Sequence, residues 1–201
     1  MTDKNFKGIS IIILAAGSSS RLGQSKQLIL VDGKTLLEKS VLAALNSGAE
    51  HVVVVLGAQA TLHNKAIENL PVKIIINEEW KKGMGNSLKA GLNYVVTKYP
   101  ETEAVIVMVC DQPFLTSEHL KKLITSFQKN PTEIVASSYN QIKGVPALFS
   151  RSMFSQLFQL EDIQGARKVI QFHKGSMQLA EFPKGEIDLD TPEDLSKLKQ
   201  Y

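Results

Sequence analysis

Small and cationic residues follow the first apolar run of this 201-residue chain. The segment Ala15–Lys26 contains two alanines, two glycines and three consecutive serines, together with Arg21 and Lys26. Small residues let backbone N–H groups approach an anion closely, an arginine donates two hydrogen bonds to phosphate oxygens, and a lysine adds a compact charge. The segment therefore predicts a phosphate-binding loop in which Arg21 and Lys26 are the catalytic cations.

Two familiar phosphate-binding motifs do not fit this segment. The P-loop G-x-x-x-x-G-K-[ST] fails because five residues separate Gly17 from Gly23, which is followed by Gln24 and Ser25. The dinucleotide motif G-x-G-x-x-G fails because Ser19 stands where its second glycine belongs. The loop is therefore of another type.

Three aspartates are candidate ligands of a cation. Asp111 follows the apolar run Ala104–Val109, and Asp188 and Asp190 come shortly before a predicted last helix. In phosphoryl-transfer sites Mg²⁺ takes one or two carboxylates together with phosphate and water oxygens. The alternative is that Asp111 caps the turn before Pro113 and that Asp190 only caps the helix.

The elements that must position these residues are short apolar runs with helix-like segments between them. The runs are rich in Ile and Val and nearly continuous, which is typical of strands covered on both faces. The predicted strands are Ile9–Leu14, His51–Leu56, Val72–Ile76, Ala104–Val109 and Glu133–Ala136. The predicted helices each share one apolar face: Leu36, Leu37, Val41, Ala44 and Leu45; Leu88, Leu92, Val95 and Val96; and Leu120, Leu123, Ile124 and Phe127. This alternation predicts an α/β fold, a three-layer, mostly parallel twisted sheet with helices on both faces, whose ligands lie beyond the C-terminal strand ends.

The last third of the chain is less regular. Ser117 is predicted to cap the helix that begins near Leu120, and Thr191 to cap a final helix. The remaining predicted elements are strands Val145–Phe149 and Met177–Phe182 and helices Ser152–Leu160 and Gly165–Phe172. Because the chain has no Pro- or Gly-rich linker and no repeat, we expect one domain, residues 1–201, with these elements added to a single sheet.

Composition excludes several classes of function. The net charge is only +3, from 23 basic and 20 acidic residues, without a run of five or six like charges, so nucleic-acid binding is not indicated. The first residues lack the apolar core of a signal peptide, and no apolar stretch approaches the roughly 18 residues of a membrane span. With a single cysteine, Cys110, the chain cannot form an internal disulfide, and we expect a cytoplasmic protein that does not bind membranes.

Five motifs in order resemble those of the MobA-like NTP transferases. The stretch Leu14–Lys26 resembles their signature L-A-A-G-x-S-x-R-[ML]-G-x-x-K. The other four are Gly83–Leu92, resembling G-x-x-x-S-x-x-x-G-[LV]; Asp111–Pro113, resembling D-[QM]-P; Gly144–Phe149, resembling G-x-P-x-[LV]-[FV]; and Asp188–Asp194, resembling D-x-D-T-P-[ED]-D. Members of this family join an NTP to a phosphorylated acceptor and release pyrophosphate. The pattern is most similar to the branch that transfers a cytidylyl group to the molybdenum cofactor.

The resemblance implies a Rossmann-like nucleotidyltransferase fold, an N-terminal nucleotide-binding part, a C-terminal acceptor-binding third and a requirement for Mg²⁺. The implied partners are an NTP, a molybdopterin-type acceptor and a recipient molybdoenzyme. The implied nucleotide-binding residues are Leu14, Ala15, Ala16, Gly17, Ser18, Lys26, Asn86, Ser87 and Asp111. The implied metal ligands are Asp111 and Asp190, with Asp188 as a substitute, and the implied acceptor-binding residues are Gly144, Pro146 and Arg167. Ser87 has a simpler alternative as a helix cap, and Trp80 either covers a ring or anchors packing.

The choice of substrate has several alternatives. The Ala-Ala-Gly form of the first motif favours CTP, because guanylyl-transferring relatives tend to have Ala-Gly-Gly and a methyl group crowds a purine more than a pyrimidine. The alternatives are a GTP-using molybdopterin guanylyltransferase, a sugar- or polyol-phosphate cytidylyltransferase, and a non-catalytic accessory protein of a molybdoenzyme. Lys26-Gln27 resembles the P-K-Q of the second group, but the proline and an H-D-A-A-R-P stretch are absent. On the acceptor side, Glu161–Arg167 departs from the usual G-D-x-G-A-R, and Val145 stands where many relatives have His.

Overall fold

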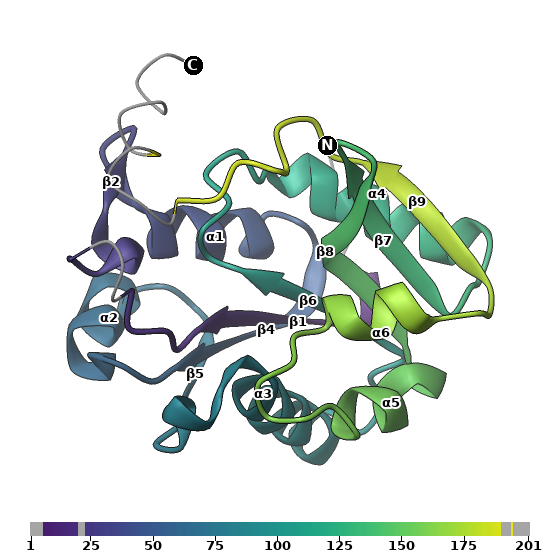
Figure 1. Ribbon diagram of the computed structural model, residues 1–201, viewed down its shortest axis with the longest axis horizontal. Helices are drawn as coiled ribbons and strands as arrows, with labels where there is room; N and C mark the ends of the chain where they lie inside the picture. Colours follow the sequence, from purple (N-terminus) through teal and green to yellow (C-terminus); the bar gives the residue numbers. More distant parts are fainter. Residues whose placement is uncertain (1–5, 20–22, 190–193, 195–201) are drawn as a thin grey trace.

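Four parallel strands rich in Ile and Val form one side of the sheet (Figure 1). The computed structural model describes residues 6–19, 23–189 and 194. Strand β1 (Phe6–Ala15) lies between β4 (Ala49–Leu56) and β6 (Ala104–Val109), and β5 (Lys73–Ile76) pairs with the outer side of β4. Ile13 pairs with Val54 on one side and Met108 on the other, and all three are fully buried. The apolar runs form these strands because both faces of the sheet are covered.

The C-terminal third adds three strands to the same sheet. In the described residues the order is β5-β4-β1-β6-β8-β7-β9. Strand β8 (Ile142–Ser150) is antiparallel to both β6 and β7 (Ile134–Tyr139), whereas β9 (Met177–Glu181) is parallel to β7. A separate two-stranded hairpin joins β2 (Leu30–Val31) to β3 (Lys34–Thr35). The predicted mostly parallel sheet is therefore confirmed, with β8 as its antiparallel strand.

Helices cover both faces of this sheet (Figure 1). One face packs against α1 (Leu36–Leu45), α2 (Ala60–Ile67) and α4 (Ser117–Lys129). The other packs against α3 (Met84–Lys98), α5 (Phe154–Phe158) and α6 (Arg167–Phe172). Alternate residues of β1 serve the two cores: Ile11 and Ile13 belong to the first, and Ile12 and Leu14 to the second. The predicted three-layer α/β arrangement is confirmed.

Several boundaries differ from the predictions. The N-cap of α4 is Thr116, whose Oγ1 accepts a hydrogen bond from the His119 N–H, and Ser117 is already helical. The predicted helix Ser152–Leu160 is shorter and is preceded by a 3₁₀ turn, η4 (Arg151–Met153). The described residues also form the 3₁₀ turns η2 (Lys26–Leu28) and η3 (Trp80–Lys82). The predicted cap Thr191 lies outside the described residues. Within the described residues, no helix combines the length and apolar character that crossing a membrane requires.

Candidate functional site

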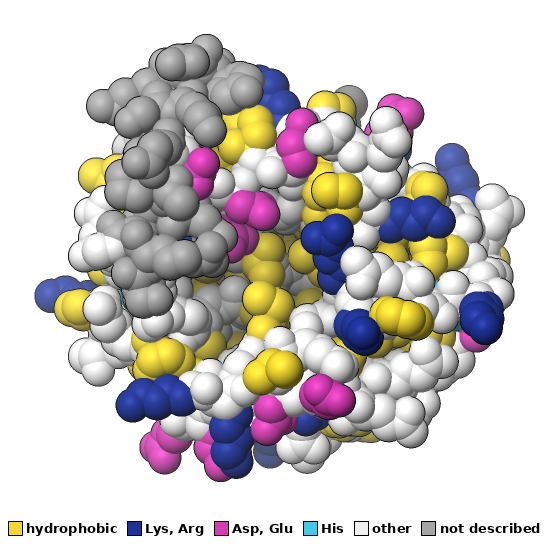
Figure 2. Space-filling view, in the orientation of Figure 1, with side chains coloured by type: hydrophobic (Ala, Val, Ile, Leu, Met, Phe, Trp, Pro, Cys, Tyr) yellow, Lys and Arg dark blue, Asp and Glu magenta, His cyan; other side chains and the backbone are white. Residues whose placement is uncertain are grey.

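A pocket of about 310 Å³ lies where β1 and β6 end and α3 begins. Its lining consists of Leu14, Ala15, Ala16, Gly17, Ser18, Lys26, Gln27, Trp80, Lys81, Gly83, Met84, Ser87, Val109, Cys110 and Asp111. The carboxyl ends of parallel strands meet at one edge of a sheet, and ligands of open α/β sheets bind there. Figure 2 shows hydrophobic side chains gathered in a hollow near the centre of this face, with acidic side chains beside it.

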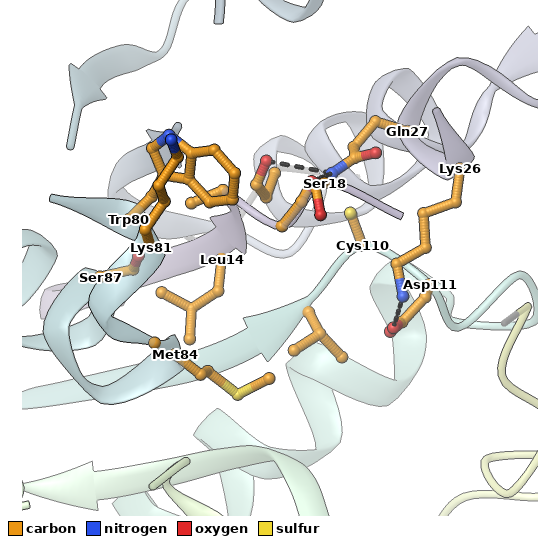
Figure 3. A pocket seen from close by; sticks show the side chains of 15 residues that line it. Leu14, Ser18, Lys26, Gln27, Trp80, Lys81, Met84, Ser87, Cys110 and Asp111 are labelled. Atoms are coloured by element: carbon orange, nitrogen blue, oxygen red, sulfur yellow. Dashed lines mark hydrogen bonds and ion pairs between the residues drawn. The ribbon is translucent and has the colours of Figure 1, made fainter. Parts of the chain in front are cut away.

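The pocket has an apolar end and a charged end (Figure 3). Leu14, Trp80 and Met84 lie at the mainly apolar end, where Lys81 is beside Trp80, and Lys26 and Asp111 point toward each other at the other end. The space for Trp80 depends on Gly57, since a Cβ atom there would lie 2.5 Å from the Trp80 Cβ. Such a division suits a ligand with a flat ring at one end and anionic groups at the other.

The charged end is built from two segments that are far apart in sequence. Lys26 Nζ donates a hydrogen bond to Asp111 Oδ2 at 2.6 Å, and both side chains are only 17% exposed. Asp111 Oδ1 is buried and has no hydrogen-bond partner among the described residues. An unpartnered carboxylate oxygen beside the predicted phosphate-binding loop is the kind of ligand that Mg²⁺ or Mn²⁺ takes, so the residues fit a divalent cation.

The C-terminal segment around Leu189 also reaches the charged end of the pocket. The Leu189 N–H donates to the backbone carbonyl of Asp111 at 3.1 Å, which brings the neighbouring Asp188 close to the charged end. Asp190 and Arg21 lie outside the described residues. No group of three or more His, Cys, Asp or Glu side chains that could hold a metal occurs in the part of the chain that the structure describes. Asp111 is thus the described carboxylate best placed for a cation.

The N-terminus of α3 forms the wall beside Ser87. The N–H groups of Gly85 and Asn86 donate to the Asp162 carbonyl at 2.8 and 3.2 Å, so the segment after α5 caps this helix. Asn77 Nδ2 donates to Asn86 Oδ1 at 2.9 Å and to Ser87 Oγ at 3.0 Å. The N-cap of α3 is Gly83, so the interpretation of Ser87 as a helix cap is wrong. Ser87 lines the pocket, whereas Asn86 lies behind it against Asn77.

The predicted acceptor residues lie next to the pocket but do not line it. Gly144 and Pro146 are buried in β8, and the carbonyl between them, that of Val145, accepts hydrogen bonds from Gln112 Nε2 at 3.2 Å and from the Tyr139 hydroxyl at 3.3 Å. Arg167 is the exposed first residue of α6. Burial and the nearby Asp188 carboxylate raise the pKa of Tyr139, and Arg167 opposes this rise. The Val145 carbonyl therefore joins this part of β8 to Gln112, the residue after Asp111.

The described part of the chain also contains functional candidates that sequence reasoning missed. Gln27 is 1% exposed and bonded to both sides of the loop, and Gln112 joins Asp111 to β8 and to Gly185. Asn77 orients Asn86 and Ser87. The adjacency of Gln27 to Lys26, and of Gln112 to Asp111, was the signal available in the sequence. Cys110 is buried, and burial raises the pKa of its thiol to about 12.

The sequence profile of the MobA-like NTP transferase domain matches residues 11–178, most of the chain. The chain belongs to the MobA-like NTP transferase family. It is accordingly an enzyme, and the α/β sheet described above is the Rossmann-like fold of nucleotidyltransferases. A solved structure of Mycobacterium tuberculosis Rv0371C in complex with manganese has a TM-score of 0.80 and 25% identity, covering 96% of this chain and 98% of that one.

Three relatives show how widely family members differ in their named activities. The chain is 32% identical over 143 residues to nicotine blue oxidoreductase of Paenarthrobacter nicotinovorans, covering 71% of this chain and 67% of that protein. It is 29% identical over 195 residues to molybdenum cofactor cytidylyltransferase of Escherichia coli, covering 96% of each. It is 31% identical over 199 residues to a probable molybdenum cofactor guanylyltransferase of Nostoc sp., covering 95% and 90%. Overall identity therefore does not separate CTP from GTP.

Proposed function

We propose that this nucleotidyltransferase moves CMP from CTP to the phosphate of a molybdopterin-type acceptor, with Mg²⁺. An oxygen of the acceptor phosphate attacks the α-phosphorus of CTP, the bond from that phosphorus to the bridging oxygen breaks, and pyrophosphate leaves. Both reactants are anions, so the protein contributes mainly positioning and charge neutralisation. The finding that the proposal depends on is the Lys26–Asp111 pair at the charged end of the pocket.

In this proposal each end of the pocket binds one part of CTP. The backbone of Ala15–Ser18 and the cations Lys26 and Arg21 hold the triphosphate. The cytosine ring lies at the apolar end against Trp80 and near Ser87, whose hydroxyl accepts from Asn77 and so keeps its own proton for the base. This assignment follows the physical division of the lining between apolar and charged residues.

The metal and the acceptor occupy the outer side of the site. Asp111 holds Mg²⁺ together with Asp190 or its substitute Asp188, because the adjoining Leu189 is bonded to the Asp111 backbone. When bound, Mg²⁺ neutralises charge on the reacting phosphates and on the departing pyrophosphate. Gly144, Pro146 and Arg167 bind the acceptor, which makes the C-terminal third of a single domain the acceptor-binding part. A cytoplasmic location and a recipient molybdoenzyme complete the proposal.

CTP is favoured over GTP by the Ala-Ala-Gly form of the loop. Ala16 is 6% exposed and lines the pocket, and its Cβ lies 2.9 Å from the place that a Cβ on Gly57 would take. The methyl group therefore fills space beside Trp80 that a larger purine would require. Identities of 29% to the cytidylyltransferase and 31% to the probable guanylyltransferase leave this local feature as the basis for the choice.

The test is pyrophosphate release with CTP, GTP, ATP and UTP in turn, in the presence of Mg²⁺ and molybdopterin. We expect release with CTP that requires both the acceptor and the metal and stops with a chelator. Preference for GTP would establish the guanylyltransferase alternative, and turnover with sugar or polyol phosphates the sugar- or polyol-phosphate cytidylyltransferase alternative. Nucleotide binding without release of pyrophosphate from any acceptor would contradict the proposal and indicate an accessory protein. Neither nucleotide binding nor release of pyrophosphate would contradict the proposal and favour chemistry like that named for the oxidoreductase relative.

A further inference from the structure

The side chain of Gln27 lies under the loop that follows β1. It is 1% exposed, and each of its amide hydrogens has a backbone acceptor: Nε2 donates to the Ala15 carbonyl at 3.2 Å and to the Gly17 carbonyl at 2.8 Å. Its Oε1 accepts from the hydroxyls of Ser19 at 3.0 Å and Ser25 at 2.9 Å. All four hydrogen-bonding positions of the amide are therefore used, and the two carbonyls fix its orientation.

The protons of this network can be assigned. Ser25 has one hydroxyl proton, which it donates to Gln27, so its oxygen must accept the bond of 2.6 Å from His63 Nε2. His63 therefore bears its proton on Nε2, and its Nδ1 is buried without a partner. Burial lowers the pKa of His63, in agreement with a neutral ring. Through Ser25, the loop is anchored to α2, which belongs to a different part of the chain.

The same network reaches Lys26. Its backbone N–H donates to Ser19 Oγ at 3.1 Å, and the Ser19 hydroxyl in turn donates to Gln27. Ser19 has a φ of 53°, which a non-glycine residue keeps only when its surroundings hold it there. The bonds of Gln27 thus join the end of β1, the middle of the loop and the segment that carries Lys26.

We infer that Gln27 is a positioning residue for polyphosphate: together with Ser25 and His63, it fixes the described parts of the loop, residues 15–19 and 23–26. The inference rests on the proposed function, because it requires that this loop hold the phosphates of a nucleotide. The hydrogen bonds of the Gln27 side chain among the described residues all go to the loop, so we infer that its effect acts through the backbone N–H groups and Lys26. A misplacement of reacting or positioning groups by about 1 Å can slow a reaction roughly 10²-fold.

The test compares binding of inorganic tripolyphosphate with binding of CMP, both with Mg²⁺, by calorimetry. The variants are Gln27→Met, a neutral side chain of similar length, and Ser25→Ala, which removes one bond of the network. The control is Thr102→Val, which removes a buried bond of similar length, 3.0 Å to Ser10 in the middle of β1. Thermal melting establishes that each variant folds.

We expect Gln27→Met to weaken tripolyphosphate binding about 10- to 100-fold, as loss of one hydrogen bond to an anion does, and Ser25→Ala about 2- to 10-fold, with little change in CMP binding. Thr102→Val should lower the melting temperature without changing either affinity. If Gln27→Met does not fold, tripolyphosphate binding by Ser25→Ala tests the inference. Wild type that fails to bind tripolyphosphate overturns the proposed function and this inference with it. Wild-type binding that the folded variants retain within twofold overturns the inference alone.

Discussion

Replacing Asp111 with Asn tests the charged end of the pocket most directly. The substitution keeps a carbonyl oxygen that can accept from Lys26 Nζ, now 2.6 Å from Oδ2, but removes the negative charge. With both side chains 17% exposed, the pair lies between a surface ion pair, worth about 0–1 kcal/mol, and a buried one, whose disruption costs about 3–5 kcal/mol. Because the hydrogen bond survives, we expect the free energy of unfolding to fall by only about 1 kcal/mol.

The effect of this substitution on turnover should be larger. Loss of one preorganised electrostatic group typically slows a reaction by roughly 10²–10³-fold, about 2.7–4 kcal/mol in the activation free energy. The Asp111→Asn variant should therefore lose Mg²⁺-dependent release of pyrophosphate while remaining folded at the assay temperature. The assay measures initial rates of release against Mg²⁺ concentration, with urea unfolding of the same preparations.

Asp32→Asn is the matched control. Asp32 forms an ion pair of the same length, 2.6 Å, with Lys39, but its side chain is 83% exposed and lies outside the pocket. We expect this variant to match the wild type in turnover and in Mg²⁺ dependence. An Asp111→Asn variant whose turnover stays within threefold of the wild type, with unchanged Mg²⁺ dependence, would refute the assignment and move the metal to Asp188 and its neighbours.

Three other substitutions test the remaining steps of the argument. Lys26→Ala should slow transfer by roughly 10²–10³-fold in rate assays without unfolding the protein, and near wild-type turnover would exclude its role. Ala16→Gly should raise kcat/KM for GTP relative to CTP by at most about 10–200-fold, and an unchanged ratio would refute the steric account. For His119, burial lowers the pKa to about 4 from an ordinary value of 6.5, so its contribution to stability is present above pH 6.5 and is lost as the pH falls toward 4. Urea unfolding at pH 7 and pH 4 should show wild type losing up to about 3 kcal/mol more than His119→Gln, and equal losses would contradict the assigned shift.

The parallel strands and the chemical character of the loop after β1 could be predicted from the amino-acid sequence alone. The strands could be found because nearly continuous Ile and Val runs suit only positions covered on both faces, and this preference is local. The loop could be found because small residues, Arg21 and Lys26 lie within a dozen positions that directly follow such a run. The order of five motifs then predicted the family, which the profile match over residues 11–178 confirmed.

Element boundaries were less predictable because neighbouring candidates compete for the same role. Thr116 and Ser117 are both good N-caps, and only the backbone of the folded chain selects Thr116, whose hydroxyl reaches the His119 N–H. Serine is a common N-cap residue, but the helix begins before Ser87. There the Asp162 carbonyl accepts hydrogen bonds from the Gly85 and Asn86 N–H groups. That carbonyl comes from a segment more than seventy residues later.

The contacts between residues of the site could be known only from the tertiary structure. Lys26 and Asp111 are 85 residues apart, and they meet because β1 and β6 are adjacent parallel strands that end at the same edge of the sheet. Strand β8 is antiparallel between β6 and β7, which brings the Val145 carbonyl to Gln112. The position of Gln27 depends on hydrogen bonds with the folded loop and with Ser25, which is itself hydrogen-bonded to His63. Hydrogen bonds and ion pairs depend on distances of about 3 Å in space, and a sequence pattern specifies such distances only within a single strand or helix turn.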